Sequence, residues 1–183
     1  MTPQPEISDE DIGRMIGIYL NDHRAGSTAG RALAERCAGS NRDTALGQYL
    51  TDEFLPQLAL ERQLLDRVRE RLGVRDNPVK QFVARAGELL GRAKLNGQVR
   101  GYSPLSRIVE LEALVGAVST KRQLWRTLAA LTTVDDNMFE ARIVDADEQR
   151  DRLDRLHRSA VVELFGSLEV TTEREADRNP SGA

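Results

Sequence analysis

The chain of 183 residues is poor in several residue types, and each shortage excludes something. Aromatic residues make up only 4% of it, which argues against an all-β sandwich or barrel, because their strands are rich in aromatic and β-branched residues. A single cysteine, Cys37, excludes an internal disulfide and predicts a reducing, cytoplasmic setting. The sequence has no apolar run of about 18 residues and its acidic N-terminus has no apolar core, so we expect neither a membrane span nor a signal peptide.

Familiar catalytic signatures are also missing from the sequence. It contains no phosphate-binding loop, dinucleotide fingerprint, Cys-x-x-Cys pair or nucleophile elbow. This favours a protein that is not an enzyme, without excluding an enzyme of another kind. What the chain does have is 40% hydrophobic and 30% charged residues, the mixture of a globular protein that buries one core.

Hydrophobic periodicity predicts an all-α protein. Ser8 before three acidic residues, Asn77-Pro78 and Ser103-Pro104 are typical helix starts. Pro56 interrupts a helical pattern and should free a carbonyl one turn earlier, near Asp52. Residues 1–8 and 167–183 are predicted to be disordered. The predicted helices cover 9–38, 43–72, 77–94, 104–131 and 136–165.

The lengths of the connections suggest how the four long helices are arranged. Two short turns make two helical hairpins, and a connection of about 30 residues between them is long enough to cross the bundle. With the pair Asp154-x-x-His157 on the last helix, this order is similar to that of the ferritin-like superfamily over residues 9–166. The phrases at 19–23 and 103–107 also resemble uncharacterised bacterial ferritin-like proteins, and no activity comes with that likeness.

The resemblance implies a place where a metal would sit. A ferritin-like di-iron site combines carboxylates with two Glu-x-x-His pairs. By the helical rise, Glu53, Glu112, Asp154 and His157 fall in one layer, roughly 27–33 Å along the bundle. Pro56 stands where one histidine would be, so the di-metal site is degenerate. The four residues could hold one iron or manganese ion, or form a hydrogen-bonded polar layer without metal.

A second polar layer is predicted lower in the bundle, at roughly 18–21 Å by the same rise. His23, Glu61, Arg122 and Arg150 all interrupt apolar stripes. Buried charges must satisfy one another, so we expect a buried ion-pair network that sets the helix register. The alternative is a small anion or substrate site lined by the two arginines.

Small residues lie beside this layer on the first helix. Gly26 and Gly30 share its inner face, which favours close helix packing, with a cavity kept open for a ligand as the alternative. Trp125 and Cys37 are expected to be core residues. The stretch 71–107 is predominantly basic, and we interpret it as a solvated face.

These patterns favour a non-catalytic binding or interaction protein, with a homodimer as one form it could take. The first alternative is a metal-dependent oxidoreductase or iron-handling protein. The second is a protein that binds anions or nucleic acid through the basic stretch 71–107. The ligand itself stays unknown from the sequence.

Overall fold

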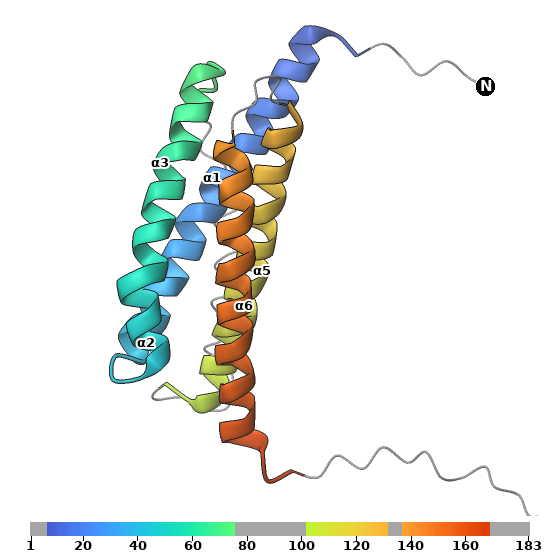
Figure 1. Ribbon diagram of the computed structural model, residues 1–183. Coiled ribbons are helices and arrows are strands. Elements are labelled where there is room, and N and C mark those ends of the chain that lie inside the picture. The colour runs from blue at the N-terminus through green and yellow to red at the C-terminus, as the bar shows by residue number, and fades with distance from the viewer. Residues whose placement is uncertain (1–6, 76–101, 132–136, 169–183) are drawn as a thin grey trace, which may run out of the picture.

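The computed structural model describes residues 7–75, 102–131 and 137–168, and every regular element within these ranges is a helix (Figure 1). The all-α prediction is therefore confirmed. The predicted extra helix at 77–94 and most of the two chain ends lie outside the described residues. The elements are α1 (Asp9–Ser40), α2 (Ala45–Tyr49), η1 (Leu50–Phe54), α3 (Leu55–Arg71), α5 (Pro104–Leu131) and α6 (Met138–Phe165).

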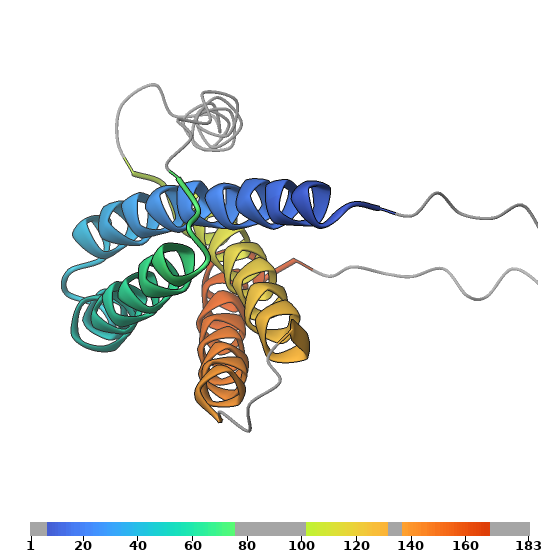
Figure 2. The same ribbon diagram turned by 90° about the horizontal axis from the view of Figure 1, so that it is seen from above.

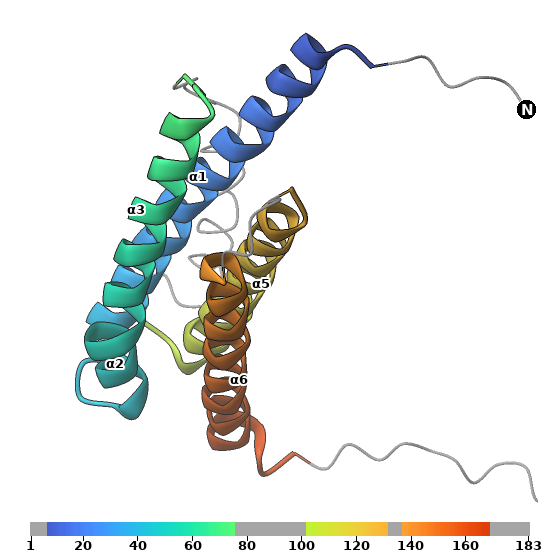
Figure 3. The same cartoon turned by 45° about the horizontal axis from the view of Figure 1, so that its top comes forward.

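The helices form two antiparallel hairpins. In Figures 1 and 3, α1 descends and α3 returns upward, whereas α5 starts at the end of the bundle where α3 starts and α6 runs back down. Helices α5 and α6 share the most extensive contact, and α1 packs against both α3 and α5. Seen from above, α3 and the α5–α6 pair lie on the same side of α1 (Figure 2). None of the described helices has both the length and the hydropathy of a membrane span.

Two of the predicted helix starts, at Ser8 and Ser103, are present as caps, and the third, at Asn77-Pro78, lies outside the described residues. The Ser8 hydroxyl accepts a hydrogen bond from the backbone N–H of Asp11, and the acidic first turn of α1 follows it. The Ser103 hydroxyl accepts from the backbone N–H of Ser106 at 3.1 Å at the start of α5. A third cap, made by Thr44 on α2, was not predicted. The helix predicted at 43–72 therefore begins at Ala45.

Pro56 leaves its mark one turn before its own position. Proline has no N–H to donate, so a regular α-helical turn would leave the carbonyl of Asp52 without its donor. The chain widens there into η1, a π-helical turn in which the N–H of Leu55 reaches back to the oxygen of Leu50. The sequence placed the disturbance correctly, and the structure shows that it is a wide turn within a continuous helical path.

The apolar core is divided into two clusters along the bundle. One is built around Phe54, Leu111 and Leu153, and the other around Leu20 and Trp125. On α1 and α5 the clusters are separated by segments near residues 21–32 and 119–123, where the polar and small residues are concentrated. The candidate functional site lies at this middle level. The sequence predicted a polar layer at the middle of the bundle with apolar residues on either side of it.

Candidate functional site

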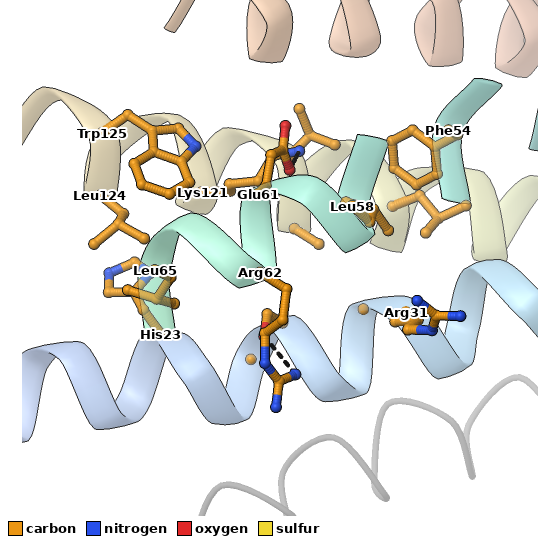
Figure 4. Close-up of a pocket in the computed structure, with 16 residues that line it drawn as sticks. His23, Arg31, Phe54, Leu58, Glu61, Arg62, Leu65, Lys121, Leu124 and Trp125 are labelled. Carbon is orange, nitrogen blue, oxygen red and sulfur yellow. Dashed lines mark hydrogen bonds and ion pairs between the residues drawn. The ribbon is translucent and has the colours of Figure 1, made fainter. Parts of the chain in front are cut away.

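A cavity of about 70 Å³ lies between α1, α3 and α5 at the level where the two core clusters part (Figure 4). Leu58, Leu114, Val118 and Leu124 give it mostly apolar walls. Its polar groups come from a few side chains described below. A mostly apolar hollow with a small number of fixed polar groups is the usual form of a small-molecule site.

The cavity exists because α1 presents glycine to it. Gly26 and Gly30 both line the hollow, one helical turn apart. A Cβ atom added at Gly30 would meet nothing closer than the Cβ of Ala117, at 3.9 Å. The helices therefore do not close on this glycine. Gly30 therefore lines the hollow without being required for a close approach of α5.

One side of the cavity is formed by a buried ion pair. The Glu61 carboxylate, with its residue only 3% exposed, lies 2.6 Å from the Lys121 ammonium. Gln149 of α6 accepts from Lys121 and donates to Glu61 at 3.2 Å and to the side-chain oxygen of Gln57 at 2.8 Å. Burial lowers the pKa of Lys121, and the neighbouring Glu61 opposes that shift. The two charges are thus balanced within one hydrogen-bonded network.

The predicted ion-pair layer was right about Glu61 and wrong about its partner. Arg122 and Arg150 both pair instead with the half-buried Asp147, at 2.8 and 3.2 Å. The reason is helical phase, since one residue along a helix rotates a side chain by about 100°. Lys121 and Arg122 follow the buried Val118 by three and four residues, and both spacings are compatible with the apolar face of α5. In the structure the rotation of α5 places Lys121, and not Arg122, on the side facing Glu61.

His23 reaches the cavity from α1 and is set apart from the Glu61 network. Its ring makes an edge-on contact with the ring of Tyr19, with centroids 4.6 Å apart. Burial lowers the pKa of His23 from its ordinary value of 6.5, and the charge of Asp22 partly opposes this. His23 therefore favours its neutral form in the folded protein.

Trp125 brings the most informative polar atom to the cavity. The residue is 1% exposed and its ring stacks on Phe139, with centroids 6.2 Å apart. The indole nitrogen lies on the side of the ring that faces Lys121 and Glu61 (Figure 4). Among the described residues, no acceptor lies within hydrogen-bond distance of this N–H. The sequence predicted a core residue, and no sequence signal indicated which way its N–H would point.

The predicted metal ligands are not gathered at one point. Glu112 and His157 are in contact at 3.3 Å, with the Glu112 side chain 59% exposed, and Asp154 is half-buried on α6. Glu53 is exposed and lines a separate groove between η1 and α6. Phe54 takes the inner position next to it. In the described ranges, no three His, Cys, Asp or Glu residues are positioned to hold a metal ion.

A further buried polar cluster, also missed from the sequence, ties the end of α1 to the start of α5. Asn41 donates to the Tyr102 hydroxyl at 2.8 Å, which donates to Glu110 at 3.0 Å, and Arg36 pairs with Glu110 at 2.8 Å. Next to it, Cys37 is fully buried, as predicted, and burial raises the pKa of its thiol to about 12. The thiol is therefore protonated and a poor nucleophile.

Comparison with known proteins gives no relative. No protein-family model, curated protein or solved structure matches this chain. The case for a function therefore rests on the cavity and on the groups that line it.

Proposed function

We propose that this chain is a non-catalytic binding protein of ferritin-like architecture, which holds a small molecule in the cavity between α1, α3 and α5. The two antiparallel hairpins and the long link between them support the architecture. The observation that carries the binding function is the Trp125 indole N–H, buried beside an open cavity with no acceptor in the described part of the chain. A buried donor without a partner costs about 1–3 kcal/mol, and a bound molecule with an acceptor would remove that cost.

The state of the ionisable groups supports binding over catalysis. A general acid or base needs a proton that it can exchange with a substrate. Glu61 and Lys121 are paired with each other and both are hydrogen-bonded to Gln149, so their charges are already committed. This arrangement is suited to holding the wall of a site in a fixed shape.

The alternative functions are less well supported. Of the predicted metal ligands, only Glu112 and His157 are in contact within the described residues, and Glu112 is exposed. This gives a metal-dependent function little support. The basic stretch 71–107 that would bind nucleic acid lies largely outside the described residues. Pairing with a second copy of the chain is a separate expectation, and the cavity does not require it.

The proposed function is tested by filling the cavity from within. Gly30→Leu adds four carbons where the nearest atom outside its own helix is 3.9 Å from the new Cβ, so its side chain would occupy the site. Gly116→Leu is the matched control, because its Cβ would meet nothing within 4 Å. We expect isobutene, an apolar probe of the same size, to raise the melting temperature of the wild type and of Gly116→Leu. Equal shifts in all three proteins would contradict the proposal.

A further inference from the structure

We infer that the molecule held by this cavity is uncharged, contains only a few carbon atoms, and presents a hydrogen-bond acceptor such as a carbonyl oxygen to Trp125. The inference rests on the proposed binding function and adds the chemical class of the ligand to it. Three observations carry it: the free indole N–H, the paired state of the charges around the cavity, and the volume available.

The indole N–H requires an acceptor on the ligand. A tryptophan side chain can donate one hydrogen bond and accept none, so only an acceptor can satisfy it. Trp125 is 1% exposed and stacks on the Phe139 ring. Its nitrogen is turned toward Lys121 and Glu61 (Figure 4). Residues 7–75, 102–131 and 137–168 supply it with no acceptor of their own. A carbonyl oxygen of a bound molecule would complete the site.

The charges around the cavity argue against an ionic ligand on energetic grounds. Each permanently charged side chain on the wall has a partner of opposite sign: Glu61 with Lys121, Arg31 with Glu35, and Arg62 with Asp66. Arg62 also donates to the hydroxyl of Ser27 at 3.0 Å. Burial keeps His23 neutral by lowering its pKa. A charged ligand beside the buried Glu61–Lys121 pair would therefore have no uncommitted counter-ion there, which is unfavourable.

The volume limits the ligand to a few non-hydrogen atoms. An apolar cavity of about 150 Å³ holds a molecule of benzene, and this cavity has about 70 Å³. Apolar side chains such as Leu58 and Val118 form most of its surface, so the rest of the ligand should be hydrocarbon. A small ketone or aldehyde has these properties.

Acetone and isobutene make a matched pair of probes, since a carbonyl oxygen in one replaces a methylene group in the other. The chain has one tryptophan, so a ¹⁵N-labelled sample gives a single indole N–H signal that reports on this atom alone. We expect both probes to perturb the signal, and acetone alone to move its proton downfield, as a new hydrogen bond requires. The measurement uses the full chain and is repeated on Gly30→Leu, in which neither probe should act.

Trp125→Phe separates acceptor recognition from general apolar binding. Isobutene is intrinsically more hydrophobic, so the informative quantity is the ratio of the two dissociation constants, acetone over isobutene. Loss of the donor should raise this ratio about tenfold, the equivalent of roughly 1.4 kcal/mol for one hydrogen bond. An unchanged ratio, with no downfield shift in the wild type, would overturn the inference while leaving the binding function intact. If neither probe binds the wild type, the proposed function fails as well.

Discussion

Glu61 and Lys121 are 60 residues apart in the sequence, yet their carboxylate and ammonium groups lie 2.6 Å apart inside the bundle. Their helices, α3 and α5, belong to different hairpins. The pair and its hydrogen bonds to Gln149 therefore connect the two halves of the protein at the level of the cavity. A contact of this kind fixes the register of one hairpin against the other.

Breaking this pair should be costly. Glu61→Ala leaves the Lys121 ammonium buried without its counter-ion, and we expect a loss of about 3 kcal/mol or more in the free energy of unfolding, measured with urea. Arg122→Ala is the control, because its pair with Asp147 is partly exposed and should be worth less than about 1 kcal/mol. A near-neutral result at Glu61 would contradict the buried pair, whereas large losses at both Glu61 and Arg122 would favour the partner predicted from the sequence.

Gly47 is required by close backbone packing. A Cβ atom at this position would overlap the carbonyl oxygen of Asn41 in the turn before α2. We therefore expect Gly47→Ala to destabilise the protein by about 1–3 kcal/mol, although alanine favours a helix. Gly116→Ala, at an open position in the middle of α5, should instead stabilise it by about 0.5–1 kcal/mol. Thermal melts of both variants test the difference in sign.

His23 should make stability depend on pH. Its folded-state pKa lies below the ordinary value of 6.5, so the unfolded chain binds a proton more readily than the folded one. The contribution of His23 is then complete above pH 6.5 and is lost progressively as the pH falls toward the folded-state pKa. We expect the decline in unfolding free energy between pH 7 and pH 5 to be shallower in His23→Gln than in the wild type. An equal slope in both proteins would place His23 in solvent.

The cluster at the start of α5 should be sensitive to a single hydroxyl. Tyr102→Phe removes an atom that accepts from Asn41 and donates to the buried Glu110, and we expect a loss of about 1–3 kcal/mol. Tyr19→Phe is the matched control. Its hydroxyl donates only to Thr127, a half-buried side chain that can turn to water, so a loss of about 0.5–1 kcal/mol is expected. Urea unfolding of the two variants side by side measures the difference.

Much of the fold could be predicted because the sequence contains local signals for where its helices begin and which face of each is apolar. Ser8 and Ser103 are local cap signals, and the apolar periodicity defines the long helices between them. Pro56 predicted the location of the π-helical turn, since a missing N–H acts on a carbonyl at a known distance. These are properties of neighbouring residues, which the sequence displays directly.

The candidate site was harder to predict because it depends on helix rotation. Lys121 and Arg122 both fit the inward stripe of α5 by spacing, and only the packing of α5 against α3 decides between them. The prediction that Glu53 faces the metal layer was wrong for a related reason. The neighbouring Phe54 points into the core, and this leaves Glu53 exposed. The orientation of the Trp125 ring depends on its side-chain rotamer, which cannot be predicted from the sequence pattern.

The most direct test of the proposed site is a crystal structure of the protein under xenon pressure. Xenon enters apolar cavities of protein interiors and is located by its anomalous scattering. Binding in the cavity predicts a xenon atom between Gly30, Leu58 and Leu114 in the wild type, and no xenon there in Gly30→Leu. A wild-type structure in which the helices close over this space, with no xenon between α1, α3 and α5, would contradict the proposed function.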